Sequence, residues 1–172
     1  MDISALLIDA YDRAVTGCRG ILEGIDTDTL HARLTENSNS IAWLVWHIAR
    51  EQDLQIAHLA GREQVWTADG WAERFDRGAE DFGFGDSPEQ VAAFRVDGPE
   101  ELLGYLDAVR EAAVAYLRTL TADDLAEVID DSYDPPVTRG VRLVSTFEDA
   151  STHLGQAAYA RSLVDSGWTI GF

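Results

Sequence analysis

The sequence contains no lysine. All thirteen basic residues in its 172 positions are arginines, and 31 acidic residues give a formal net charge of −18. The absence of lysine excludes a Schiff-base enzyme and a Walker-type phosphate-binding loop. The excess of negative charge argues against nucleic acid and against anionic membrane surfaces, because both partners are themselves negatively charged. We therefore expect no nucleic-acid partner and no membrane partner.

Cysteine and long apolar runs are equally scarce. The single Cys18 excludes an internal disulfide and a cysteine-based zinc cluster, and it is expected to be a small buried apolar residue. No apolar run approaches the ~20 residues that span a bilayer. The sequence begins with acidic rather than basic residues before its first apolar stretch, which is not typical of a signal peptide. We therefore expect a cytoplasmic protein.

Apolar residues make up 46% of the sequence, enough for a proper core in a single domain spanning 1–172. Apolar spacings of three and four predict four long helices. A bundle of four long helices, with a long connection between the second and the third, is the all-α fold that this pattern favours. The long helices are expected at 2–23, 39–61, 99–120 and 144–166.

The segments between these helices are less regular. The connection over 62–98 is expected to hold short helices near 68–77 and 88–95, and a connection of this length in a small domain usually covers something or carries function. A short helix is expected over 122–128, and 137–144 is expected to be either extended or a loop.

Three residues could together hold a metal ion. His47 lies in the apolar half of the second long helix, where a buried imidazole needs a partner, and a metal is one such partner. Asp149 and His153 are four residues apart in the fourth long helix, so they share one face one turn apart. Two histidines and one carboxylate form a common ligand set that leaves positions open for water or substrate.

The same spacing also fits arrangements without a metal. A hydrogen-bonded core histidine and a surface ion pair between Asp149 and His153 would give the same pattern. Glu51, four residues after His47, could be an extra ligand or an acceptor for an imidazole N–H. His58 lies ~16 Å farther along the same helix and cannot share the ion.

Two segments resemble motifs of a known family. The run from Ser40 to Arg50 (SIAWLVWHIAR) resembles the second-helix motif of the DinB-like superfamily of metal-binding four-helix bundles. The residues 142–144 and 149–159 are similar to its fourth-helix motif, and the likeness covers essentially the whole chain. The resemblance implies a divalent metal (Zn, Ni, Fe or Mn) held by His47, Asp149 and His153, with aspartate where many members have histidine or glutamate.

The family includes mycothiol-dependent maleylpyruvate isomerase and transferases that use mycothiol or bacillithiol. The resemblance therefore implies a metal- and thiol-dependent transferase or isomerase acting on a small electrophilic substrate, with the thiol bound as a thiolate. Glu51 and Tyr159 are the candidates for proton transfer. Arg50, Arg139 and Arg142 are the candidates for binding an anionic cofactor or substrate.

Two other functions fit the same sequence. The chain could be a non-catalytic bundle that binds a metal or ligand, or a structural helical protein with a dry core at His47 that binds a protein partner. The tryptophans are expected to be packing residues. Family members often form homodimers, and Trp66, Trp71 and Phe82, where exposed, could serve such a dimer or cover the pocket.

Overall fold

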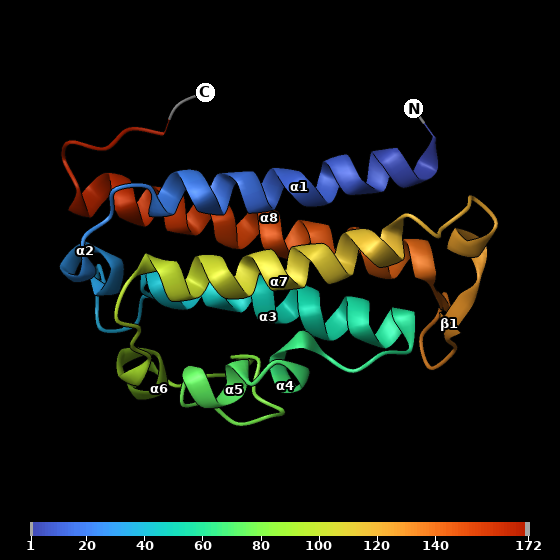
Figure 1. The fold of residues 1–172 in the computed structure, drawn as a ribbon, viewed down its shortest axis with the longest axis horizontal. Helices are drawn as coiled ribbons and strands as arrows, with labels where there is room; N and C mark the ends of the chain where they lie inside the picture. The colour runs from blue at the N-terminus through green and yellow to red at the C-terminus, as the bar shows by residue number, and fades with distance from the viewer. Residues whose placement is uncertain (1, 171–172) are drawn as a thin grey trace.

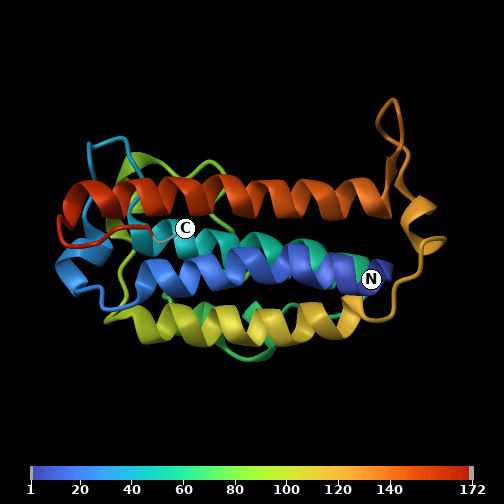
Figure 2. The same cartoon turned by 90° about the horizontal axis from the view of Figure 1, so that it is seen from above.

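Four long helices dominate the computed structural model, which describes residues 2–170. They pack side by side as a bundle, and short helices of the long connection lie along one side of it (Figures 1 and 2). The predicted all-α bundle, with its long connection between the second and third long helices, is confirmed. The long helices are α1 (Ile3–Leu22), α3 (Ile41–Ala60), α7 (Pro99–Leu117) and α8 (Arg139–Val164).

The long connection determines the directions of the helices. The chain returns along the bundle between α3 and α7, so these two helices run the same way, whereas α1 and α8 run the opposite way (Figures 1 and 2). Helix α3 packs against both α7 and α8, and α1 packs against the same two helices. The antiparallel seam between α3 and α8 therefore brings the two predicted ligand-bearing helices together.

Helix α3 is the centre of the core. The Ser40 side chain accepts a hydrogen bond from the backbone N–H of Trp43 at its start, and Gly61 ends it in the left-handed conformation, with φ of 61°. These are the ordinary start and stop signals of a helix. Between them nearly every face is buried, including the indole of Trp46, which is completely enclosed. Polar groups on this helix are therefore cut off from water: His47, Arg50 and Asp53 find protein partners, whereas the side chain of Gln52 has no hydrogen-bond partner among the residues described.

The two tryptophans of the connection belong to this core. Trp66 is 0% exposed and Trp71 is 9% exposed, which confirms the packing role expected of the tryptophans and contradicts the alternative that these two are exposed. Their rings pack against Tyr105 of α7, with centroids 5.3 Å and 5.4 Å away. Burying these two large apolar rings stabilises the fold, so the rings do not form a surface patch. Phe82 is half-buried.

The chain between the third and fourth long helices also differs from the expected pattern. Helix α8 begins at Arg139, because the Thr138 side chain caps it through the N–H of Val141. Only β2 (Val137–Thr138) is extended, and it pairs antiparallel with β1 (Val128–Asp130). The helix expected over 122–128 is reduced to the 3-10 turn η1 (Asp124–Ala126).

Four short helices complete the fold. Within the connection these are α4 (Val65–Ala68), α5 (Trp71–Arg74) and α6 (Pro88–Ala93), close to the two predicted there. The fourth, α2 (Thr27–His31), was not predicted, although the Asp26 side chain caps it through the N–H of Thr29. Among the residues described, no helix combines the length and the apolar character needed to cross a membrane.

Asp53 anchors the long connection to the bundle. This residue of α3 is 0% exposed, and its carboxylate accepts hydrogen bonds from the backbone N–H groups of Val65 and Trp66, at 3.0 Å and 2.8 Å. It also accepts one from the Tyr105 hydroxyl at 3.1 Å. The guanidinium of Arg50, also fully buried, lies 3.8 Å away. One carboxylate therefore joins α3, α4 and α7.

We predict that Asp53→Ala lowers the free energy of unfolding by about 3–5 kcal/mol, because it leaves a buried arginine without its carboxylate. Urea denaturation followed by circular dichroism measures the change. Asp69→Ala, at an exposed position in the same connection, is the control and should shift stability by less than ~0.5 kcal/mol. Equal shifts in the two variants would contradict the anchoring role.

Candidate metal centre

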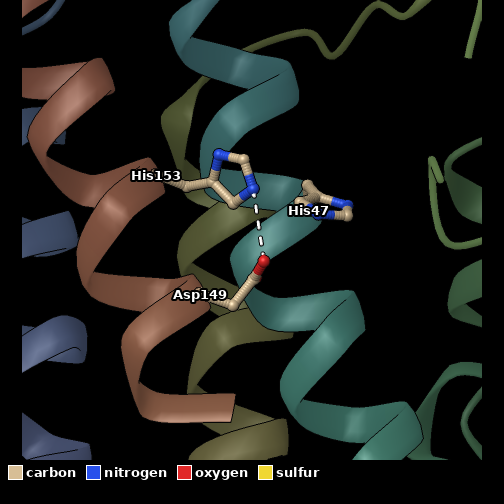
Figure 3. Close-up of side chains that lie close together, drawn as sticks. All are labelled: His47, Asp149 and His153. Atoms are coloured by element: carbon tan, nitrogen blue, oxygen red, sulfur yellow. Dashed lines mark ion pairs between the residues drawn. The ribbon is translucent and has the colours of Figure 1, made fainter. Parts of the chain in front are cut away.

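Helices α3 and α8 bring His47, Asp149 and His153 together. Ligand atoms of all three residues lie within 4.8 Å of one another. Figure 3 shows Asp149 and His153 on adjacent turns of α8, with His47 facing them from α3. The His153 Nε2 atom lies 3.5 Å from a carboxylate oxygen of Asp149. The helical spacing of four residues and the α3–α8 seam thus produce the geometry that the sequence predicts.

Both imidazoles are held by hydrogen bonds on their Nδ1 atoms. His47 Nδ1 lies 2.6 Å from the backbone carbonyl of Phe82, and since a carbonyl can only accept, Nδ1–H is the donor. His153 Nδ1–H donates to the side-chain oxygen of Gln156 at 2.9 Å. In its neutral form each ring therefore has the lone pair of Nε2 available for another partner, and when His153 is protonated its Nε2–H faces Asp149 instead. The neutral form is the usual arrangement of histidines that ligate metals.

Neither of these two acceptors was predicted from the sequence. Gln156 lies three residues after His153 on the same helix, so its spacing was a usable signal. The Phe82 carbonyl had no such signal, because it is a backbone group in a loop 35 residues away. The indole of Trp43, one turn before His47, stacks on the imidazole at 4.8 Å with an interplanar angle of 12°.

Burial differs across the three residues. His47 is 6% exposed, whereas the side chains of His153 and Asp149 are 19% and 33% exposed. The centre therefore opens to solvent on the α8 side. A cavity of about 760 Å³ between α1, Leu154 and residues 168–170 contains none of the three.

The electrostatics favour a charged pair on α8 beside a neutral histidine on α3. Burial lowers the pKa of His47, and the neighbouring His153 charge lowers it further. The hydrogen bond to Asp149 raises the pKa of His153 despite partial burial. Burial opposes ionisation of Asp149, but the hydrogen bond and charge of His153 outweigh it and lower the pKa of the carboxyl.

Glu51 lies next to this group. Burial, and then the charge of Asp149, raise the pKa of Glu51 to about 7, although Gln55 and Arg142 act in the opposite direction. A carboxyl group that titrates near neutrality can both donate and accept a proton. Of the two candidates for proton transfer, Glu51 is therefore the one that the fold brings near the three residues.

Tyr159 is not brought to the centre. It is 65% exposed on α8 and lies beside Leu44 and Gln156 in a shallow surface pocket that also includes Asn37. Tyr159 lies six positions after His153, and this spacing on a helix directs the Tyr159 side chain to a different face of α8 from that of His153. The structure therefore places Tyr159 apart from His47, Asp149 and His153.

Arg50 and Arg139 have structural roles. The Arg50 side chain is 0% exposed and donates to the Asp81 carbonyl, the Tyr105 hydroxyl and the Gln64 side chain, so it has no surface to offer a ligand. Arg139 lies ten residues before Asp149, about 15 Å along the helix axis. It is bound by the Leu59 carbonyl, Tyr116 and Glu127.

Arg142 is the arginine best placed to meet a ligand. It lies two helical turns before Asp149 on the same face of α8, and its side chain is 28% exposed. It donates to the Gln55 side chain at 3.0 Å and lies 3.9 Å from Asp130.

The fold and the site together have the features of a candidate metal-binding bundle. Two histidines and one carboxylate face each other across the seam between two of its four long helices. The model of the DinB superfamily matches residues 10–157. The chain therefore belongs to the DinB superfamily, as its motifs indicated.

A solved structure supports the same fold. A conserved protein from Enterococcus faecalis, known from its crystal structure, shares 35% sequence identity with this chain, and the two structures match with a TM-score of 0.88. The similarity covers 96% of this chain and 99% of that one. Comparison with curated proteins found no match.

We predict that Glu51 makes the metal-free protein less stable as pH rises from about 4.5 through 7. With its pKa raised from 4.5 to about 7, the folded state binds this proton more tightly than the unfolded state does in that window. The contribution lost is on the order of 2–3 kcal/mol. Urea denaturation at several pH values in the presence of a chelator measures it.

Glu51→Gln should remove this part of the pH dependence, since glutamine does not titrate. The other ionisable groups are unchanged, so the difference between the two stability curves isolates Glu51. Parallel curves for the wild type and Glu51→Gln would contradict the prediction.

Proposed function

We propose that His47, Asp149 and His153 hold a divalent metal ion, and that the protein is a metal-dependent enzyme that uses a low-molecular-weight thiol such as mycothiol. The observation that carries the proposal is the convergence of two imidazole Nε2 atoms and one carboxylate, with each Nδ1–H already committed to an acceptor.

The residues present fit a metal ion. The Asp149 Oδ2 atom is buried and has no hydrogen-bond partner among the residues described, so it is an acceptor in need of a cation or donor. Two imidazole nitrogens and one carboxylate suit Zn, Ni, Fe or Mn, and three ligands leave coordination positions open. Aspartate is shorter than glutamate, but its place one turn before His153 brings it within 3.5 Å of that ring.

A bound metal would supply Lewis acidity that stabilises a thiolate near neutral pH. The chain's own residues would do the rest. Glu51 would move a proton at its carboxyl group, because its pKa lies near 7. Arg142 would attract an anionic group of the thiol or the electrophile, since it is the accessible arginine on the same face as Asp149.

We predict that the purified protein binds one Zn²⁺ per chain, and that His47→Ala and His153→Ala each weaken binding by more than roughly 100-fold, because loss of even an outer partner costs 10–100-fold. Competition with a chromophoric chelator measures the affinity. His58→Ala, an exposed histidine on α3, is the matched control and should leave the affinity unchanged.

Two results would contradict the metal site. One is equal, weak binding in the wild type and both ligand variants. The other is a more stable His47→Leu variant with no loss of metal, which is the result expected of a structural protein with a dry core at His47.

We predict that the Zn-loaded protein joins mycothiol to an alkyl halide such as monochlorobimane. A C–S bond forms, chloride leaves, and the thiol proton passes to a base. Turnover should disappear in His47→Ala, and Glu51→Gln should lower kcat by roughly 10²–10⁴-fold if its carboxyl group takes that proton. Bimane fluorescence follows the reaction.

The electrophiles in this test should include an epoxide and maleylpyruvate, because the site does not define the substrate's leaving group. Tight metal binding without turnover on any of them would contradict the enzymatic proposal. It would support instead a non-catalytic bundle that binds a metal or ligand through the same residues.

A further inference from the structure

The loop of residues 81–86 lies directly against the candidate metal ligand on α3. The carbonyl of Phe82 accepts the 2.6 Å hydrogen bond from His47 Nδ1. The next residue, Gly83, is so close to α3 that an added Cβ would lie 2.8 Å from the Trp43 ring, 2.9 Å from the Trp46 ring and 3.1 Å from His47 Nδ1. No side chain larger than a hydrogen atom fits there without moving the loop or the rings.

Arg77 fastens this loop at both ends. Its guanidinium lies 2.6 Å from the Asp81 carboxylate and 2.7 Å from the Asp86 carboxylate, and it stacks on the Trp46 ring at 4.6 Å. Arg77 is 11% exposed and Asp86 is 6% exposed, so this pair is shielded from water and salt. A planar fork of donors holds two carboxylates at once in a fixed relative geometry.

Two groups from α3 complete the attachment. The indole N–H of Trp43 donates to the same Asp86 carboxylate at 2.8 Å, and the buried Arg50 donates to the Asp81 carbonyl at 2.9 Å. The Asp81 carboxylate also accepts from the N–H of Gly83 at 3.0 Å. The peptide between Phe82 and Gly83 is thus held on both sides, which leaves its carbonyl little freedom.

We propose that Arg77, Asp81, Asp86 and Gly83 are positioning residues that press the Phe82 carbonyl onto His47 Nδ1 and thereby fix the tautomer that leaves Nε2 free for a metal. The proposal rests on the proposed metal site for its purpose, but the tautomer is a property of the metal-free chain. A neutral imidazole carries its proton on only one of its two nitrogens. An acceptor placed against Nδ1 favours the form with the proton on Nδ1 and the lone pair on Nε2. Without this carbonyl, the proton can sit on Nε2 and block coordination.

Gly83→Ala and Gly85→Ala form a matched pair that tests this arrangement. Both glycines have positive φ, 83° and 80°, so both variants bear a similar backbone penalty. An added Cβ meets the Trp43, Trp46 and His47 rings at position 83 and nothing within 4 Å at position 85. Only Gly83→Ala should therefore displace the Phe82 carbonyl from the imidazole.

The first readout is the His47 tautomer in the metal-free protein, from long-range ¹H–¹⁵N correlation spectra of the imidazoles at a pH where His47 is neutral. We expect the Nδ1–H form in the wild type and in Gly85→Ala, and a shift toward the Nε2–H form in Gly83→Ala. The second readout is Zn²⁺ affinity, which should fall 10–100-fold in Gly83→Ala. In Gly85→Ala it should change less than about 3-fold.

Arg77→Ala tests the same arrangement without altering the loop backbone, and it keeps the proposal testable if Gly83→Ala fails to fold. Its control is Arg74→Ala, which also removes an arginine stacked on a tryptophan, at 4.5 Å from Trp71, but touches neither aspartate. Arg77→Ala should shift the tautomer and weaken Zn²⁺ binding in the direction of Gly83→Ala, and Arg74→Ala should do neither.

The two readouts separate this proposal from the proposed function. If the wild type binds no Zn²⁺, the metal site fails, but the tautomer comparison still decides whether the loop positions His47. A wild-type tautomer in both Gly83→Ala and Arg77→Ala would overturn the positioning role, whatever the metal does. A Zn²⁺ affinity that falls equally in Gly83→Ala and Gly85→Ala would overturn it as well.

Discussion

The structure depends on one constraint, which is that three polar side chains are buried along a single face of α3. His47, Arg50 and Asp53 follow one another at intervals of three residues, and burial obliges each to find a partner. All three find partners in the connection between α3 and α7: the Phe82 carbonyl, the Asp81 carbonyl and the N–H groups of Val65 and Trp66. The long connection is therefore the hydrogen-bonding complement of α3, and this explains why its short helices lie along the bundle instead of extending into solvent.

The all-arginine composition suits this arrangement. Arg50 donates to the Asp81 carbonyl and lies over the Trp66 ring, and Arg77 binds two carboxylates and lies over the Trp46 ring, each with one planar group. Lysine offers a compact charge on a flexible stem and lacks the planar group that both stacks on an indole and fixes the positions of two carboxylates. The large negative charge is thus partly internal, because Asp53 and Asp86 are buried and matched by guanidinium groups.

The sequence was informative wherever the pattern is local. Spacing along a helix was enough to predict the bundle and to place Asp149 and His153 on one face, and the apolar surroundings of His47 indicated a buried imidazole. It failed where long-range packing decides. The packing role of Trp66 and Trp71 was expected, but their irregular surroundings did not show against which helices they pack; they enter the core because the connection folds back on α3 and α7. The role of Arg50 was equally hidden, since its partners lie 14–55 residues away.

The same geometry separates two aspects of the candidate centre. Around His47, the loop of residues 81–86 and the Trp43 ring control the orientation of one ligand. Farther along α3 and α8, Glu51, Gln55 and Arg142 form a polar row that begins beside Asp149 and leads away from that loop. Changes in the loop should therefore alter how tightly an ion is held, whereas changes in the polar row should alter what approaches it and how a proton moves. Asp149 is the residue where the two meet, because it faces both imidazoles and its charge raises the pKa of Glu51. An ion that neutralises Asp149 would weaken that effect, so occupancy of the site would itself make Glu51 easier to ionise.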